Sequence, residues 1–121
     1  MNKLILFGRS PKLLMEKTRI YRKDSADAWI QRDKYGTEEK MGWAIDHIFP
    51  ESFGGDEKDI NLQALQWENN RAKSNNFLDF KTSVDSIGKS YLKKEQYWAL
   101  EDNSIGLLKQ HYPENKHLKS L

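Results

Sequence analysis

The chain has 121 residues, of which 37% are hydrophobic and 31% charged, and its formal net charge is +2. This length favours one domain, residues 1–121, with a modest core, and an aromatic content of 12% argues against disorder. The absence of cysteine excludes disulfides and thiolate zinc sites, and no apolar run is long enough to span a membrane. We therefore expect a soluble, cytoplasmic protein with no membrane partner.

The N-terminal segment, residues 1–23, is strongly basic. It holds seven lysines and arginines against one glutamate, which gives it a charge of +6. Such a segment is typical of a phosphate-binding surface, and a solvated helix face accounts for the same charges equally well. Because Ser10 suits an N-cap and Pro11 the first helical position, a helix is predicted over about 11–19.

Two short apolar stretches follow the basic segment. Residues 28–30 and 42–45 have the composition of strands, and the charged segment 33–40 between them contains a turn at 35–37. This order predicts that the two strands pair as an antiparallel hairpin.

A further strand and a helix are predicted next. Pro50 stops strand pairing, residues 60–65 form the second short apolar run, and residues 66–75 contain no glycine or proline that would interrupt a helix. On that helix, Asn70 and Lys73 are three residues apart and share a face.

Residues 77–113 are expected to support this central part, and residues 114–121 to form a frayed tail. We predict a hairpin turn at 86–89, a strand at 97–100 and a final helix over about 102–112. Phe77, Leu78 and Phe80 are expected to close the core, and Ile105, Leu108 and Tyr112 to form one apolar face of the final helix.

Side chains able to bind a metal or to transfer a proton gather in the central part. His47 directly follows Asp46, Asn61 lies 14 residues later, and Asn70 nine after that. Neighbours on a strand point to opposite faces, so Asp46 and His47 serve one site only where the strand ends. A strand, loop, strand and helix in this order can bring the four side chains together. Asp46 and Asn70 offer only oxygen ligands, which suit Mg²⁺ or Mn²⁺.

Each of these features alone has a common structural explanation. An Asp-His pair is most often a surface pair or a buried histidine with its hydrogen bonds made, a Gly-Gly pair is a turn, and a polar helical segment is a solvated face. Their occurrence together, in this order and at these spacings, makes coincidence improbable.

The combined pattern resembles the HNH endonuclease motif of the ββα-metal nucleases. The resemblance covers about residues 41–76 and is carried by Asp46-His47-Ile48-x-Pro50, Gly54-Gly55, Asn61-Leu62-Gln63-x-Leu65 and Asn70-Arg71-x-Lys73. It implies a small α+β domain built on a hairpin-plus-helix core of the ββα-metal type. An N-terminal helix and a C-terminal strand and helix would flank that core.

The resemblance also implies a role for each matched residue. His47 falls at the general base that activates the attacking water, and Asn61 at the residue that holds the loop so that His47 keeps its orientation. Asp46 and Asn70 fall at the ligands of a catalytic Mg²⁺ or Mn²⁺. Because the base must be neutral, activity is expected to rise through about pH 6–7.

Two further matched residues fall where the helix of the family faces the nucleic-acid backbone. Arg71 and Lys73 are therefore expected to bind phosphates. The implied function is metal-dependent hydrolysis of phosphodiester bonds in DNA, with RNA not excluded as partner. A module that binds nucleic acid on the same scaffold without cleaving it is the alternative, and a protein–protein partner domain is a third class that no feature favours.

The sequence departs from the family pattern in two ways. The third signature position is Asn70 instead of histidine, which makes an HNN-type variant. Gln66 and Asn69 stand where many members carry one cysteine pair of a structural zinc site, so no structural zinc is expected. We expect packing to replace it, by Trp29, Trp43, Trp67 and Trp98.

The other two histidines are expected to have structural surface roles. His111 falls near the end of the final helix, where a cation is favourable, and His117 falls in the tail.

Overall fold

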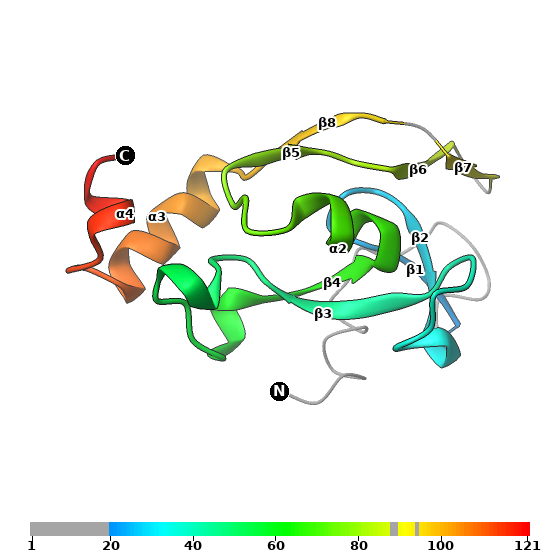
Figure 1. The fold of residues 1–121 in the computed structure, drawn as a ribbon, viewed down its shortest axis with the longest axis horizontal. Coiled ribbons are helices and arrows are strands. Elements are labelled where there is room, and N and C mark those ends of the chain that lie inside the picture. Colours follow the sequence, from blue (N-terminus) through cyan, green and yellow to red (C-terminus); the bar gives the residue numbers. More distant parts are fainter. Residues whose placement is uncertain (1–19, 88–89, 94) are drawn as a thin grey trace.

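The computed structural model describes residues 20–87, 90–93 and 95–121. Within them the fold is a small α+β arrangement of four two-stranded antiparallel sheets and three helices, as Figure 1 shows. The helix predicted over about 11–19 lies outside the described residues. None of the described helices is long and apolar enough to cross a membrane.

The first hairpin joins β1 (Tyr21–Lys23) to β2 (Trp29–Gln31). Asp24 closes the turn between them, because its Oδ1 accepts hydrogen bonds from the backbone N–H groups of Ala26 and Ala28 at 2.9 and 2.7 Å. The side chain of an aspartate thus replaces backbone pairing inside a tight turn, as this residue type commonly does.

The predicted pairing of residues 28–30 with residues 42–45 is therefore wrong. The first of these stretches pairs with β1, a run of three residues that includes an arginine and a lysine and shows no apolar alternation. The second stretch begins β3 (Trp43–His47), whose partner is β4 (Leu62–Gln66). The two hairpins still meet in the core, where Ile30, Trp43 and Ala64 form a buried cluster.

The β3–β4 hairpin leads directly into α2 (Trp67–Lys73). The predicted strand at 60–65 and helix at 66–75 are thus confirmed. Each end of the helix lies within two residues of its predicted position. The helix starts at Gln66, because the side-chain oxygen of this residue accepts hydrogen bonds from the N–H groups of Glu68 and Asn69 at 2.7 and 3.1 Å. These donors are among those that an α-helix leaves unpaired at its first turn.

Two more two-stranded sheets lie on the other side of α2 from β3 and β4, as Figure 1 shows. β5 (Asp79–Lys81) pairs with β8 (Tyr97–Ala99), and β6 (Val84–Ile87) pairs with β7 (Ser90–Lys93). The last residue of β6 pairs with the first of β7, and residues 88–89, on which the predicted hairpin turn falls, lie outside the described residues. The predicted strand at 97–100 is confirmed.

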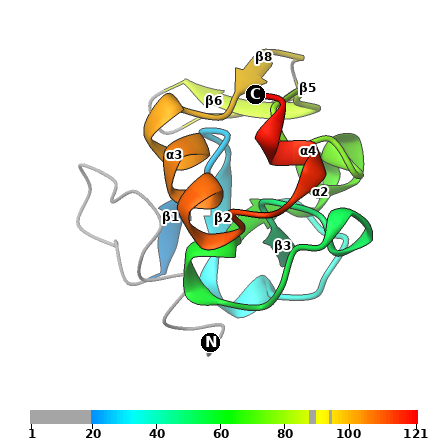
Figure 2. The same ribbon diagram turned by 90° about the vertical axis from the view of Figure 1, so that its left-hand side faces the viewer.

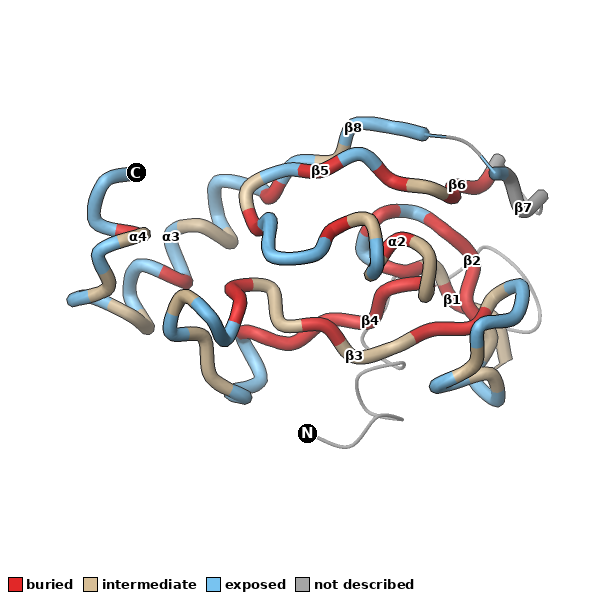
Figure 3. Tube along the Cα trace, viewed as in Figure 1, coloured by how far each residue is buried: buried red, intermediate tan, exposed pale blue. Residues whose placement is uncertain are grey.

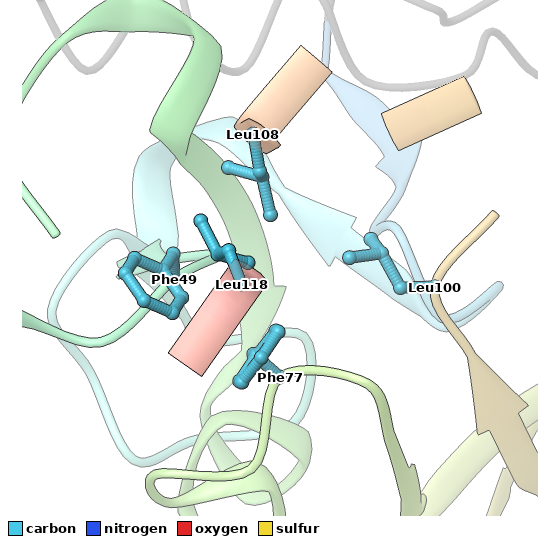
Figure 4. Packing of buried hydrophobic residues seen from close by; sticks show 5 residues of the cluster. All are labelled: Phe49, Phe77, Leu100, Leu108 and Leu118. Atoms are coloured by element: carbon cyan, nitrogen blue, oxygen red, sulfur yellow. The ribbon is translucent and has the colours of Figure 1, made fainter. Parts of the chain in front are cut away.

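The chain ends in α3 (Asp102–His111) and α4 (Lys116–Lys119), which lie together at one end of the molecule in Figure 1 and face the viewer in Figure 2. They bury a cluster of apolar side chains, shown in Figure 4, that consists of Phe49, Phe77, Leu100, Leu108 and Leu118. Ile105 and Tyr112 pack against this cluster, so the predicted apolar face of the final helix is confirmed.

The prediction that residues 114–121 form a frayed tail is wrong. Leu118 is only 1% exposed, and the side-chain amide of Asn115 donates to the carbonyl oxygen of Phe53 at 2.7 Å. The ring of His117 stacks on Phe53 with 4.5 Å between centroids. The C-terminal segment thus covers the loop between β3 and β4.

The buried residues concentrate along β2, β3 and β4, as Figure 3 shows. Among the four tryptophans expected in the core, Trp29 and Trp43 are 4% and 0% exposed, whereas Trp67 and Trp98 are only partly buried. The core also contains many polar side chains, which concern the candidate site.

Candidate functional site

The most buried charged pair of the described chain joins β3 to α2. The Lys73 ammonium lies 3.1 Å from Asp46 Oδ2, and the side chains are 1% and 10% exposed. Lys73 Nζ also donates to the carbonyl oxygen of His47 at 2.9 Å, and Gln63 Nε2, across the hairpin, donates to Asp46 Oδ2 at 2.9 Å. Lys73 is therefore placed as an internal partner of Asp46 and does not point to the surface that phosphate binding requires.

The charge state of Asp46 is set by opposing influences. Burial raises the pKa of the Asp46 carboxyl above its ordinary value, and the nearby Lys73 ammonium and the hydrogen bond from Gln63 lower it. The net shift is upward, because removal from water disfavours the carboxylate more than its partners favour it. The neighbouring Lys73 ammonium thus offsets only part of the effect of burial on the Asp46 carboxyl.

His47 has different neighbours from Asp46. It is the last residue of β3, its side chain is 24% exposed, and its Nε2 lies 3.1 Å from Glu51 Oε1. That approach is close enough for an ion pair but is not aligned as a hydrogen bond, so Nε2 is covered without a hydrogen-bond partner among the described residues. Glu57 is the third member of this group, and ligand atoms of the three residues lie within 4.8 Å of one another. Since Glu51 and Glu57 are exposed, and exposed carboxylates often cluster without a metal, we assign no ion to this group.

Asn61 fixes the loop that follows His47. Its side chain is fully buried, accepts a hydrogen bond from the N–H of Phe49 at 2.7 Å, and donates to the carbonyl oxygens of Phe49 and Asp56 at 3.0 and 2.8 Å. Gly55 passes so close that an added Cβ would lie 1.9 Å from the Phe49 oxygen. The second glycine of the sequence motif is thus required by the close approach of two backbone segments.

The same loop is also held from the C-terminal end of the molecule. The Tyr112 hydroxyl donates to Asp56 Oδ1 at 2.7 Å and accepts from the Asp56 N–H at 3.0 Å, and His111 Nε2 lies 3.2 Å from Asp56 Oδ2. The hydrogen bond from Tyr112 is the main reason why the pKa of Asp56 lies below its ordinary value. His111 therefore contributes to anchoring this loop, and its position fits the expected structural role.

Asn70 and Arg71 border an open groove of about 300 Å³ between α2, the start of β3 and the loop at residues 36–38. No hydrogen bond of the Asn70 side chain to another described residue is found. The Arg71 guanidinium is exposed, lies 5.0 Å from the centre of the Trp67 ring, and bonds through Nη2 to Glu38 Oε1 at 2.8 Å. Among the predicted residues, Arg71 thus keeps a position from which it can reach a phosphate.

A buried network around Asp24 was missed by the sequence analysis. Asp24 Oδ2 accepts from the N–H of Gln66 at 2.9 Å and from Asn69 Nδ2 at 3.2 Å, and the Asn69 side chain also bonds to the backbone of Ser83 and Val84. Burial raises the pKa of Asp24 to about 6 despite these donors. Gln66 and Asn69, which stand at the positions of the cysteine pair in the sequence motif, thus help to connect three sheets by hydrogen bonds. The expected tryptophan packing is therefore not the only contact that holds these sheets.

The residues expected to bind a divalent metal do not form a ready site for one. The only carboxylate of the set, Asp46, is already paired with the Lys73 ammonium, and an added divalent cation would lie close to this positive charge. Asn70 alone supplies one neutral amide oxygen, which is a poor donor set for Mg²⁺ or Mn²⁺. In this arrangement the ion does not fit unless Lys73 leaves Asp46.

Comparisons of the chain with protein-family models, with curated proteins and with solved structures found no match. The functional argument therefore depends on the residues themselves and on the arrangement just described.

Proposed function

We propose that the chain is an HNN-type endonuclease that hydrolyses phosphodiester bonds of DNA, with β3, β4 and α2 as a ββα-metal core. The observation that supports this most is the position of Asn61. Its buried side chain binds both backbone polar groups of Phe49, two residues after His47, and so fixes the course of the chain where the proposed base stands. A general base is effective only when such contacts hold it in place.

His47 is the proposed general base. In the proposed step, the unprotonated ring nitrogen of His47 accepts a proton from water. The resulting hydroxide attacks the phosphorus and the bond to the 3′ oxygen breaks. The 3′ oxyanion takes a proton from solvent, so the products carry a 5′ phosphate and a 3′ hydroxyl group. Arg71 binds the backbone on the α2 side.

The resemblance to the HNH motif adds a divalent cation to this proposal. Such an ion supplies Lewis-acid stabilisation of the charge that develops on the phosphate. Because the Lys73 ammonium is paired with Asp46 in the free protein, we assign no step to the ion. The experiment below decides whether activity requires a divalent cation.

The second candidate is a module that binds nucleic acid and does not cleave it. The specific observation in its favour is the same ion pair, because Lys73 supplies internally the positive charge that a nuclease would take from a metal. In such a module the exposed Arg71 still contacts phosphate, but neither His47 nor a cation takes part in a reaction of the bound nucleic acid.

The test is the nicking of supercoiled plasmid in Mg²⁺, in Mn²⁺ and in excess chelator. Wild type is expected to nick in at least one metal and not with chelator. His47→Ala is expected to lower the rate by about 10²–10⁴, the usual contribution of a general base, while DNA binding is retained. His117→Ala is the matched control, since it also removes a partly buried imidazole, and it should leave the rate within a few-fold of wild type.

Two results would change the conclusion. Binding by wild type without nicking in any metal would favour the non-cleaving module. Equal nicking by wild type and His47→Ala would show that His47 is not the general base, and it would contradict the proposed activity.

A further inference from the structure

The groove beside α2 has a mixed lining, of which the proposed reaction uses only Arg71. Its walls include Thr37 and Glu38 from the loop, Ala44 from β3, and Trp67, Asn70 and Arg71 from α2. At about 300 Å³ it lies at the lower end of the range for small-ligand sites. It combines aromatic surface, one amide and one guanidinium, which are the groups that contact the base, sugar and phosphate of a nucleotide.

The groove lies next to Asp46 along both elements that form it. Ala44 precedes Asp46 by two residues on β3, so the two side chains share a face and are separated by roughly 6–7 Å along the strand. Asn70 precedes Lys73 by three residues on α2 and lies on the same side of that helix. Ala44 in the groove and the proposed base His47 lie three residues apart on β3, roughly 10 Å along the strand, so one strand of nucleic acid is long enough to contact both.

In the free protein a carboxylate occupies the anion-binding position of the groove. Glu38 Oε1 lies 2.8 Å from Arg71 Nη2, and the two side chains are 68% and 67% exposed. An ion pair this exposed is weak, because water and salt screen it. The backbone below Glu38 is held more firmly, since Trp67 Nε1 donates to the carbonyl oxygen of Glu39 at 2.8 Å. The Glu38 side chain can therefore move away while the wall of the groove stays in place.

We propose that this groove binds one unpaired nucleotide next to the cleaved phosphate, and that Glu38 occupies the phosphate position until substrate arrives. The phosphate of that nucleotide replaces the Glu38 carboxylate on Arg71, and its sugar and base lie along Trp67. In a duplex the base faces are covered by their neighbours, so only an unpaired nucleotide can enter a concave aromatic groove. The inference rests on the proposed function for its substrate class and adds single-stranded or locally opened strands as the preferred form.

The test measures binding separately from cleavage. A fluorescein-labelled single strand of mixed sequence and a duplex of the same length are titrated with protein in chelator, in the His47→Ala background, and followed by anisotropy. We expect Glu38→Gln to tighten binding of the single strand roughly two- to fivefold, the range for release of an exposed ion pair. Arg71→Ala should weaken binding and lower the slope of log affinity against log salt by about 0.7, the value for one phosphate contact with a single strand.

Three comparisons make the result specific. Glu114→Gln is the matched control, because it removes the same charge from another exposed pair, 2.8 Å from Lys119 Nζ, and should change affinity less than Glu38→Gln. In the Arg71→Ala background, Glu38→Gln should have no effect, which a double-mutant cycle reports as coupling. Trp67→Leu should weaken the single strand more than the duplex.

The proposal is overturned if Glu38→Gln acts no more strongly than Glu114→Gln, if its gain survives in Arg71→Ala, or if the duplex binds as tightly as the single strand. Plasmid nicking by wild type keeps this failure separate from failure of the proposed function. Nicking without coupling between Glu38 and Arg71 would contradict only the proposed nucleotide site in the groove. Coupling without nicking would contradict only the proposed nuclease activity.

Discussion

Two of the buried aspartates among the described residues, Asp24 and Asp46, are stabilised in opposite ways. Asp24 accepts hydrogen bonds from four N–H donors of the described residues, whereas Asp46 faces the ammonium of Lys73 and one amide. Around Asp24, uncharged donors surround a single carboxylate, and this arrangement depends on fixed backbone geometry. The arrangement around Asp46 depends on a cation that belongs to a long side chain and can in principle be exchanged for another. The comparison assigns Asp24 to the architecture and Asp46 to the site.

The largest expected effect comes from breaking the Asp46 pair from one side. Asp46→Ala should lower the free energy of unfolding by about 3–5 kcal/mol, because the Lys73 ammonium is left buried without a countercharge. Asp46→Leu combined with Lys73→Met should recover most of this loss, since two apolar groups replace two desolvated charges. Urea unfolding measures both, with the m value as a check that the transition is the same.

A double variant that is no more stable than Asp46→Ala would contradict this account of the pair. Glu114→Ala is the control for loss of an exposed ion pair and should change stability by no more than about 0.5 kcal/mol.

The next largest effect is the change in the free energy of unfolding with pH, from which the contribution of Asp24 can be measured separately from that of Asp46. Burial raises the pKa of Asp24 from 3.8 to about 6, so the folded state keeps this proton at pH values where the unfolded chain has released it. Between these values the folded state binds more protons, and the free energy of unfolding therefore falls as pH rises. A shift of this size corresponds to about 3 kcal/mol over the window.

The measurement is the stability of wild type and of Asp24→Asn between pH 3.5 and pH 7. The raised pKa of Asp46 acts in the same direction and the lowered pKa of Asp56 in the opposite direction, but both are present in each protein. The difference between the two curves thus reports Asp24. If the curves are parallel, Asp24 has an ordinary pKa in the folded protein.

The same substitution also has an effect at fixed pH. At pH 7, Asp24→Asn should cost about 2 kcal/mol, because either orientation of the amide places its NH₂ group against two N–H donors and leaves them unpaired. Asp27→Asn is the matched control in the same turn. Asp27 is exposed and has φ of 72°, a conformation that asparagine tolerates, so this variant should be close to wild type. Equal losses in the two variants would show that the turn, and not the Asp24 network, determines stability.

The difference between the two aspartates also explains what the sequence could predict. The β3, β4 and α2 elements and the residues of the motif follow from local pattern, since apolar runs, loop glycines and a polar helix lie in order within about 30 residues. The Asp24 network does not, because Asp24 and its partner Gln66 are 42 positions apart and neither type is typical of a core. The burial of Lys73 was unforeseeable for the same reason, although it decides how the site is charged.

The errors in the fold have a related cause. β1 is a three-residue strand with two cations, so it exists because of its turn and its partner and not because of its own propensity. The C-terminal helix α4 has one buried apolar side chain, Leu118, whose contacts come from distant segments of the core. A single apolar residue in a polar sequence shows no helical or strand periodicity. The sequence pattern therefore predicted a frayed tail.

The smallest expected effect concerns the exposed pair between Glu38 and Arg71. Glu38→Gln should change the free energy of unfolding by less than about 1 kcal/mol, because solvent screens two charges that are each more than two-thirds exposed. Urea unfolding measures this on the same scale as Asp46→Ala, in which an ion pair of similar length is buried. A loss of 3 kcal/mol or more, the value expected for a buried pair, would show that the loop at residues 36–38 depends on this contact. Glu38 could then not give way to a phosphate without partial unfolding of the groove. A small loss, with tighter binding of the single strand, would separate the two ion pairs of α2 by function: one holds Asp46 in the folded chain and the other yields to substrate.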